Sequence, residues 1–475
     1  MFAWSWNANT ALGLAVYFLG VAISIVFVAK ILTTRNAPAV TLLWVTLIIA
    51  APFIGLLLYY LLPRRIRLRR LRQRTARLSG FTPARVASDK VELARHPIAS
   101  FLAHIAPNSC SGGNAVTILE TGEQFFGALE QAIRTATKFV HIEIYILRPD
   151  GTGERVLREL TDAARRGVEV RLLYDHIGSW SLKRRHLRAL TQAGGKAVPY
   201  LPLLWRRRPF TINLRNHRKL AVIDGDTAFV GGRNVGLEYQ SDKFGEDASW
   251  LDAMVRVCGP GVGPMHAVFA EDWLNASEEE LGGAYFPDPG PVGPAWVGTV
   301  ANGPDRERNV LRHVLNEMVS RARKTIEISS PYFVPHPTIC FALETAALRG
   351  VRIRLHTNGG HAGNFVLYRV ARSHYERLLR FGVEVIETRR DYNHAKMFIV
   401  DGKTLYLGSS NLDMRSFELN FELGCLLIEP NVCATALRMF DERSSAGRRI
   451  GPEDLRDGRV GRVIDGVFRL FSPVL

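Results

Sequence analysis

Two long apolar runs open the chain, and each is long enough to cross a membrane. They fall within about residues 11–30 and 38–62, and the only charged side chain inside them is Lys30, at the end of the first. A helix of about 20 apolar residues spans a hydrocarbon core of about 30 Å. Residues 1–10 contain no Lys or Arg, which argues against a cleaved signal peptide. The pattern therefore predicts a transmembrane hairpin of two helices over residues 1–63.

A basic segment follows the second run. Eight arginines lie between Arg64 and Arg77, whereas the connector between the runs holds only Lys30 and Arg35. Because positively charged loops stay on the cytoplasmic side, this arrangement predicts a multi-pass membrane protein whose catalytic region is cytoplasmic. Two interpretations of the arginines stay open: a topology signal alone, or contact with anionic lipid headgroups. We take residues 64–113 as a basic juxtamembrane linker.

The rest of the chain alternates strand-like and helix-like patterns, twice over. The apolar runs FVHIEIYI, from Phe139, and TIEISSPYF, from Thr325, are each followed by a helical pattern and a Gly-Val turn. A stretch rich in proline and glycine, residues 282–295, connects the two copies. The first repeat is expected over 114–281 and the second over 296–475. The predicted fold class is α/β, with two α/β/α sandwich repeats that form a pseudo-dimer.

Charge and cysteine content add two exclusions. The 475-residue chain has a net charge of +16, and no Asp or Glu precedes Asp89. The eleven Lys and Arg residues before Asp89 leave only +5 for the remainder, so the charge does not indicate a nucleic-acid partner for the catalytic region. The five cysteines show no CxxC or CxxH spacing. We expect reduced thiols, no metal site and no cofactor.

One short motif occurs twice in register. The pattern is HxKxxxxD, and the chain holds it at His217, Lys219 and Asp224 and again, 177 residues later, at His394, Lys396 and Asp401. Asn234 and Asn411 follow the two copies at the same offset. A single match to this pattern often occurs by chance, whereas two matches at a constant offset rarely do. We therefore infer a duplicated catalytic half-site.

The residue types in this motif suit chemistry at phosphorus. Alternate residues of a strand share one face, so His217 and Lys219 present an imidazole and an ammonium group to one spot. An imidazole can attack phosphorus, while Lys and an Asn amide stabilise the charged oxygens. A second imidazole can protonate the leaving alcohol and later deprotonate the incoming one. The two half-sites therefore predict phosphodiester chemistry that needs no metal.

These motifs resemble those of the phospholipase D superfamily, and most closely the bacterial cardiolipin synthases. The strings that carry the resemblance are NLRNHRKLAVIDG, GGRNVGLEY, SSPYFVPH, NHAKMFIVDG and GSSNLDMRSFELNFE. The resemblance covers essentially the whole chain. It implies two phospholipase D-like repeats, a phosphohistidine intermediate and a location in the bacterial inner (cytoplasmic) membrane. The chain departs from the family at residues 356–364, HTNGGHAGN, where an acidic residue is usual.

The resemblance also implies roles for single residues. His217 is expected to be the nucleophile and His394 the general acid and base. The phosphate would be held by Lys219, Lys396, Asn234, Asn411 and Ser409. Asp224 and Asp401 complete the two motifs, but each follows apolar strand residues and precedes a glycine, so a structural role in a turn is favoured over direct chemistry.

Each imidazole needs an acceptor for its second ring nitrogen, which fixes the tautomer. Glu422 is the family's match for the partner of His394. Glu422 precedes LGCLLIEP and Asp252 precedes AMVRVCGP, each with a proline eight residues later. Asp252 therefore occupies the equivalent place in the first half, after an insertion. We expect His217 to pair with Asp252 and His394 to pair with Glu422.

The predicted function is that of a cardiolipin synthase. Such an enzyme transfers a phosphatidyl group from one phosphatidylglycerol to another and releases glycerol. Its expected partners are phospholipid substrates and the membrane bilayer, without nucleic acid. The alternatives are a membrane-anchored phospholipase D that hydrolyses phospholipids or exchanges their headgroups, and a nuclease with the same motifs. A non-catalytic scaffold is disfavoured because both His, Lys and Asn sets are intact.

Overall fold

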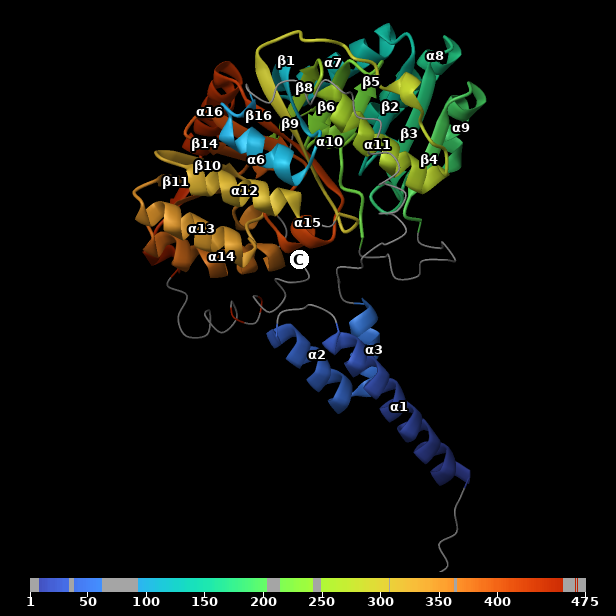
Figure 1. The fold of residues 1–475 in the computed structure, drawn as a ribbon, viewed down its shortest axis with the longest axis vertical. Helices are drawn as coiled ribbons and strands as arrows, with labels where there is room; N and C mark the ends of the chain where they lie inside the picture. The colour runs from blue at the N-terminus through green and yellow to red at the C-terminus, as the bar shows by residue number, and fades with distance from the viewer. Residues whose placement is uncertain are drawn as a thin grey trace, which may run out of the picture. The chain divides into compact units, whose positions relative to one another are not determined.

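The structure is a computed structural model that describes most of the chain. The described residues are 8–33, 38–61, 93–202, 214–241, 249–306, 308–362 and 365–455, together with 466 and 468. The chain divides into two compact units, Met1–Arg64 and Arg65–Leu475 (Figure 1). The predicted basic segment between Arg64 and Arg77 lies outside the described residues.

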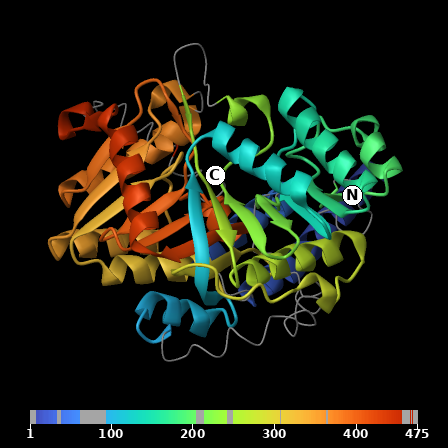
Figure 2. The same ribbon diagram turned by 90° about the horizontal axis from the view of Figure 1, so that it is seen from above.

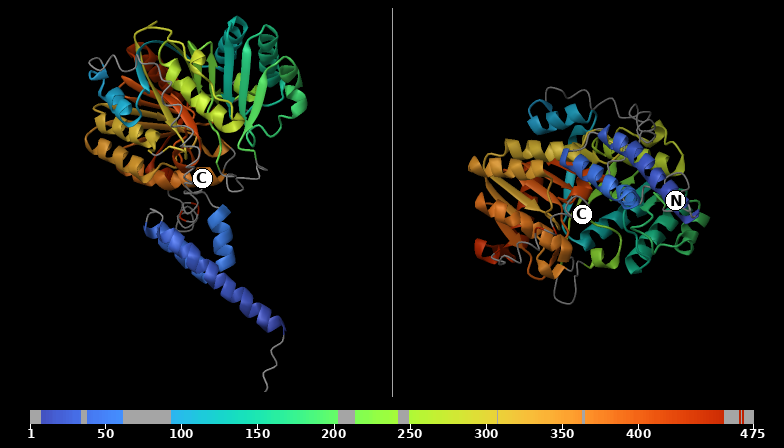
Figure 3. Two further views of the ribbon diagram at one scale, coloured as in Figure 1. Left: turned by 45° about the vertical axis from the view of Figure 1, so that its right-hand side comes forward. Right: turned by 90° about the horizontal axis from the view of Figure 1, so that it is seen from below.

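The N-terminal unit contains three apolar helices. They are α1 (Ala8–Leu32), α2 (Pro38–Ala50) and α3 (Pro52–Leu61), and α1 contacts both of the others (Figure 3). Ile31, Ile48 and Tyr59, one from each helix, form its buried centre. The rings of Trp44 and Tyr59 meet edge to face at 5.3 Å.

The second apolar run does not form one continuous helix. It divides at Pro52 into helices of 13 and 10 residues, because proline lacks an N–H and its ring clashes with the preceding turn. Among the residues that the structure describes, no helix combines the length and the hydropathy that crossing a bilayer requires. This finding contradicts the transmembrane hairpin predicted with helices at about 11–30 and 38–62, and with it the predicted multi-pass location in the inner membrane.

The second unit is built on one sheet of 15 strands (Figure 2). The strands before the connector are β1 (Cys110–Leu119), β2 (Phe139–Ile144), β3 (Glu169–Asp175), β4 (Lys196–Tyr200), β5 (Leu220–Ile223), β6 (Thr227–Gly231), β7 (Trp250–Leu251) and β8 (Met254–Cys258). Those after it are β9 (Ala295–Asn302), β10 (Thr325–Ser329), β11 (Arg352–Thr357), β12 (Glu384–Glu387), β13 (Tyr392–Asn393), β14 (Met397–Val400), β15 (Thr404–Gly408), β16 (Glu422–Ile428) and β17 (Arg448–Ile450). β7 and β13 form a separate two-stranded sheet.

The strand order of the large sheet repeats. From the centre outward, the first half reads β1-β8-β6-β5-β2-β3-β4, and the second reads β9-β16-β15-β14-β10-β11-β12, with β17 added at the edge. Each strand of the first half has its equivalent at the same place in the second. The halves join where β1 pairs antiparallel with β9, so a single sheet runs through both.

Helices cover both faces of this sheet. The helices of the first half are α6 (Pro97–Ile105), α7 (Gly122–Thr135), α8 (Gly151–Arg165), α9 (Arg184–Gln192), α10 (Leu237–Gln240) and α11 (Val262–Ser277). Those of the second are α12 (Val310–Arg321), α13 (Pro337–Leu348), α14 (Phe365–Arg380), α15 (Met414–Glu418) and α16 (Pro430–Ser445). One buried core lies under α7, α8 and α9, and another under α6, α12, α13 and α14. A third core, with Trp273 of α11 and Phe440 of α16, spans strands of both halves.

The helix starts follow from local sequence. Asp150 caps α8, its carboxylate accepting the N–H groups of Thr152 and Gly153 at 3.1 Å each. Thr121 caps α7 in the same way through the N–H of Gln124. Both helices then place apolar side chains on one face, which packs on the sheet.

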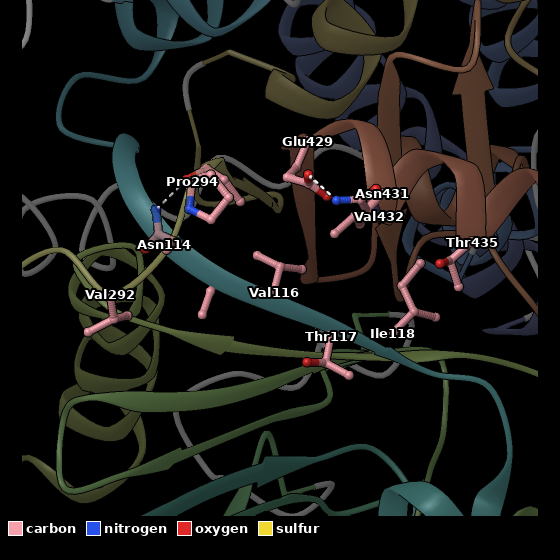
Figure 4. A pocket seen from close by; sticks show the side chains of 13 residues that line it. Asn114, Val116, Thr117, Ile118, Val292, Pro294, Glu429, Asn431, Val432 and Thr435 are labelled. Atoms are coloured by element: carbon pink, nitrogen blue, oxygen red, sulfur yellow. Dashed lines mark hydrogen bonds between the residues drawn. The ribbon is translucent and has the colours of Figure 1, made fainter.

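Asn114 stabilises the seam between the two halves, which is the antiparallel pair of β1 and β9. Its amide nitrogen donates to the carbonyls of Ser111 at 2.9 Å and Ala295 at 3.2 Å, and its amide oxygen accepts the N–H of Gly261 at 2.7 Å. The side chain is fully buried at the edge of a hollow of about 390 Å³ between β1, the connector and the start of α16 (Figure 4). One amide thus satisfies three backbone groups near the β1–β9 junction.

Replacing Asn114 by Ala should destabilise the catalytic unit by about 2 to 3 kcal/mol, because buried backbone groups lose their partners. Urea unfolding followed by intrinsic fluorescence measures the change. Thr117→Val, at an exposed position of the same strand, is the matched control and should change the free energy of unfolding by less than about 0.5 kcal/mol. Equal stabilities of the Asn114→Ala variant and the wild type would contradict this role.

Candidate active site

Each motif is held by main-chain bonds to the opposite half of the unit. The N–H of His217, just before β5, donates to the carbonyl of Phe421 at 2.9 Å. The N–H of His394, just before β14, donates to the carbonyl of Leu251 at 2.7 Å. In the second case the contact is a short parallel pairing of β13 with β7. These bonds bring the two motif segments together from sequence positions far apart.

The imidazoles are oriented by buried carboxylates from the opposite half. Nδ1 of His217 lies 3.0 and 3.1 Å from the two carboxylate oxygens of Glu422. Nδ1 of His394 lies 2.6 Å from Oδ2 of Asp252. An ionised carboxylate only accepts hydrogen bonds, so Nδ1 of each ring carries the hydrogen. Each Nε2 then keeps a free electron pair, as a nucleophile or general base requires.

The predicted pairing of these four residues is wrong. We expected His217 with Asp252 and His394 with Glu422, whereas the structure pairs His217 with Glu422 and His394 with Asp252. Asp252 and Glu422 do occupy equivalent positions, directly after β7 and at the start of β16. Each of these positions faces the motif of the other repeat, so the partners are exchanged between the halves.

Burial and the exchanged pairs set the protonation states. Burial, with the nearby Lys396, lowers the pKa of His394 to about 3. Burial also lowers the pKa of His217. For Asp252 burial acts in the opposite sense, but the charges of His394 and Lys396 hold its pKa at about 2. In the free protein near neutral pH, both rings are therefore neutral and face ionised carboxylates.

The motif lysines are buried beside the imidazoles. Nζ of Lys219 donates to the carbonyl of His217 at 2.7 Å, and Nζ of Lys396 makes the equivalent bond to the carbonyl of His394. Burial lowers the pKa of Lys219 to about 7 and that of Lys396 to about 8. The ammonium group of Lys219 also lies 5.2 Å from the centre of the Tyr145 ring. A phosphate anion between the lysines would favour their charged forms.

The two asparagines expected at the phosphate are differently engaged. The amide oxygen of Asn234 accepts the N–H of Ile146 at 3.1 Å, and its nitrogen donates to the hydroxyl of Tyr239 at 2.9 Å. The nitrogen of Asn411 donates to Asp413 at 3.2 Å, while its buried oxygen has no hydrogen-bond partner within the described part of the chain. Of the two, Asn411 is the one with an unused polar atom.

Ser409 serves the carboxylate rather than a phosphate. Its hydroxyl donates to Glu422 at 2.5 Å and accepts the N–H of Leu423 at 3.0 Å, so its hydrogen is already used. The predicted contact of this hydroxyl with a phosphate would have to replace its bond to Glu422. At the equivalent position, Gly232, a side chain would collide with the carboxylate of Asp252. Asp252, the shorter side chain, therefore lies against Gly232, whereas Glu422, the longer one, is bonded to Ser409.

Asp224 and Asp401 hold turns away from the imidazoles. Both adopt positive φ angles, 52° and 53°. The carboxylate of Asp224 accepts three N–H groups at the start of β2, from Thr137, Lys138 and Phe139. Asp401 does the same at the start of β10. These contacts fit the structural role favoured from sequence and do not bring the two carboxylates to the reacting groups.

Sequence reasoning missed the asparagine that precedes each histidine. The side-chain oxygen of Asn216 accepts the N–H of Arg218 at 3.1 Å, and that of Asn393 accepts the N–H of Ala395 at 3.2 Å. Each forms a tight local turn around the intervening histidine. Both motif strings begin with Asn-His, so extending the repeat by one residue would have found them.

The departure at HTNGGHAGN has a structural explanation. Asn358 stands after β11 where Asp175 stands at the end of β3. Asp175 accepts the N–H of Asn216 at 2.9 Å, and Asn358 accepts that of Asn393 at 2.7 Å. The amide thus keeps the backbone contact without the charge. Within the described residues, no cluster of three or more His, Cys, Asp or Glu side chains is arranged to hold a metal ion.

Comparison with known proteins points to one family. The family model described as cardiolipin synthase, PLD-like domain, matches residues 129–243 and 315–444. The cardiolipin synthase of Geobacillus sp. (strain WCH70) is 33% identical over 487 residues, covering 99% of this chain and 95% of that protein. The probable cardiolipin synthase YwiE of Bacillus subtilis (strain 168) is 33% identical over 447 residues, covering 92% and 88%.

A solved structure shares the fold. The crystal structure of phosphatidylserine synthase from Haemophilus influenzae Rd KW20 superposes with a TM-score of 0.57, covering 76% of this chain and 95% of that chain at 16% sequence identity. At that identity the likeness concerns the fold alone. With the family match, it confirms the predicted α/β phospholipase D-like fold of the catalytic unit.

The exchanged pairs predict which histidine loses its fixed tautomer when one of the two carboxylates is replaced by an amide. Glu422→Gln should allow His217 to adopt both neutral tautomers, because an amide can donate to Nδ1 as well as accept from it. His394 should keep its hydrogen on Nδ1. Ring ¹⁵N chemical shifts of labelled histidine at neutral pH distinguish the two tautomers.

Asp252→Asn is the matched change and should affect His394 alone. If Asp252→Asn altered the ring of His217 instead, the pairing within each half, as expected from sequence, would be restored.

Proposed function

The chain belongs to the cardiolipin synthase family of phospholipase D-like proteins, and from this premise we propose that it transfers a phosphatidyl group between two phosphatidylglycerol molecules and releases glycerol. The observation that carries the proposal is the pair of neutral imidazoles, each fixed by an ionised carboxylate and accompanied by a buried lysine. This arrangement suits a covalent phosphohistidine route. Its lipid substrates reside in bilayers, so we propose that it meets them at a bilayer surface.

The reaction divides into two displacements. Nε2 of His217 attacks the phosphorus of the first lipid, and the bond from phosphorus to the glycerol oxygen breaks while His394, which takes up a proton from solvent once the anionic phosphate is bound, supplies that proton from Nε2. The terminal hydroxyl of the second lipid then gives its proton to His394 and attacks the phosphorus, which breaks the bond to His217. The assignment of nucleophile and acid follows the family resemblance. The low pKa of His394 makes its protonated form a strong acid toward the leaving alkoxide.

The lysines hold the charge that develops in each step. With Lys219 and Lys396 on both sides, the phosphate oxygens meet ammonium groups in a site that burial shields from water. The amide nitrogen of Asn411 has a second N–H beside the one that it donates to Asp413, and we assign this donor to the phosphate. Asp252 at 2.6 Å stabilises the imidazolium form of His394 before the first step and after the second.

We further propose that the catalytic unit is a pseudo-dimer of two phospholipase D-like repeats, residues 114–281 and 296–475, joined by the connector 282–295. The repeated strand order supports this division. So does the equivalence of the two cross-half bonds that end on Phe421 and Leu251. In this arrangement each repeat supplies one histidine and the carboxylate for the other.

Purified protein with phosphatidylglycerol vesicles tests the proposed function. Cardiolipin and glycerol should appear in equal amounts, measured by lipid mass analysis and a glycerol assay. Phosphatidic acid as the main product would instead support a phospholipase D, and cleaved DNA would support a nuclease. Absence of any turnover would contradict an enzymatic role.

Trapping of the intermediate tests the two histidine roles. With phosphate-labelled phosphatidylglycerol, His394→Ala should acquire label slowly and then retain it, while turnover falls about 10²-fold or more, because His217 can still attack but both displacements lose their proton transfer. His217→Ala should retain no label. Label on the His217→Ala variant and none on His394→Ala would reverse the roles.

The lysines predict an alkaline limb in the pH profile. A lysine carries its charge below its pKa and loses it above, so kcat/KM for phosphatidylglycerol should fall as the pH rises through about 7 to 8. Lys219→Arg keeps its charge at higher pH and should move the fall upward. A wild-type profile that stays level to about pH 10, where an unperturbed lysine titrates, would contradict the lowered pKa values.

A further inference from the structure

A cavity of about 290 Å³ lies beside His217, and its wall is unlike the surroundings of His394. Arg215 from the first half and Arg415 from the second both line it, with Tyr145 and Tyr332. The side chain of Arg215 is 6% exposed. Two guanidinium groups in a small, half-enclosed space favour an anion that carries several oxygens, such as a phosphodiester.

The carboxylates near these arginines are occupied by other donors. Asp175, 3.5 Å from Arg215, also accepts the N–H groups of Asn216, Ile177 and Gly178. Asp413, which lines the cavity, accepts the N–H of Ser416 at 2.7 Å and the amide of Asn411 at 3.2 Å. A guanidinium group has five N–H donors, so Arg215 and Arg415 can bind a further anion beside the contacts that they already make.

Two amide oxygens on the same wall lack donors. Oδ1 of Asn411 and Oδ1 of Asn420 are buried, and neither has a hydrogen-bond partner among the described residues. Their orientation is fixed, because each amide nitrogen donates to a carboxylate, of Asp413 and of Glu422 respectively. A buried acceptor without a donor is costly, so a ligand with hydroxyl groups would satisfy both. The cavity therefore suits a group with a phosphate and hydroxyls together.

The equivalent positions near His394 have a different chemistry. Counting along the repeat, Arg215 corresponds to Tyr392 and Arg415 to Glu238, while Asn420 corresponds to Trp250. The ring of Trp250 lies 5.3 Å from the ring of His394, and that of Tyr392 lies 6.1 Å away. Both histidines border aromatic rings, since the ring of Tyr145 lies 4.9 Å from that of His217, but the cavity beside His217 adds arginines and amides. The cationic cavity belongs to only one of the two half-sites.

We propose that this cavity binds the phosphoglycerol headgroup of the second, accepting phospholipid. The inference rests on the proposed function and deepens it. The arginines hold the phosphate of the acceptor, and the amide oxygens of Asn411 and Asn420 accept hydrogen bonds from its glycerol hydroxyls. A headgroup bound in this cavity holds the terminal hydroxyl of the acceptor lipid close to the phosphohistidine. The cavity thereby favours lipid synthesis over hydrolysis.

Two reactions measured in one sample test the subsite. With phosphatidylglycerol vesicles and labelled glycerol, cardiolipin formation uses an acceptor that bears a phosphate, whereas incorporation of label into phosphatidylglycerol uses a neutral acceptor. Arg415→Gln should lower the ratio of cardiolipin formed to glycerol incorporated by about tenfold or more, the effect of losing one charge-assisted bond. Arg415→Lys, which keeps the charge, should recover part of the ratio.

The controls separate the possible failures. Glu238→Gln, the matched position of the other half, should leave the ratio at the wild-type value. An unchanged ratio in Arg415→Gln, with both reactions slowed alike or neither slowed, would overturn the subsite while leaving the proposed function in place. Wild-type protein that carries out neither reaction would overturn the proposed function and the subsite with it. Because glycerol incorporation is measured on the same protein, it also reports that the variant is folded.

Discussion

The active site depends on an exchange of carboxylates between the two halves of the catalytic unit. A buried imidazole needs an acceptor to fix its tautomer, and a buried carboxylate needs donors to offset its loss of hydration. Here each need is met across the seam, by Glu422 for His217 and by Asp252 for His394. Neither repeat contains a complete half-site of its own. The shared sheet, the paired segments near the motifs and the common core follow from this requirement.

The repeat explains how much could be predicted from sequence. A fixed offset of 177 residues located both histidines and both lysines, the family resemblance gave Glu422, and the spacing to a proline then located Asp252. The offset identifies equivalent positions, but it carries no information about which copy a side chain faces. The partners were therefore exchanged in the prediction. The bond from Ser409 to Glu422 could not be predicted for a related reason, since it is formed by the fold and not by adjacent residues in the chain.

The remaining differences come from local features that a hydropathy pattern does not weigh. A run without charges reads as one helix, yet Pro52 divides it because a missing N–H and a ring clash act on the backbone and not on polarity. The asparagines at 216 and 393 escaped notice because their role is to turn the chain rather than to react. The departure at Asn358 keeps a backbone bond and alters only charge. The residue types at such positions are determined by backbone geometry and not by hydropathy.

The seam of β1 and β9 has a mechanical consequence. An antiparallel ladder of hydrogen bonds joins the halves in one sheet, and the bonds to Phe421 and Leu251 join them again beside the histidines. Moving the halves apart like jaws would break all of these bonds together. The position of one imidazole relative to the other is thus set by a sheet and by main-chain bonds that the two halves share, and not by a hinge between them.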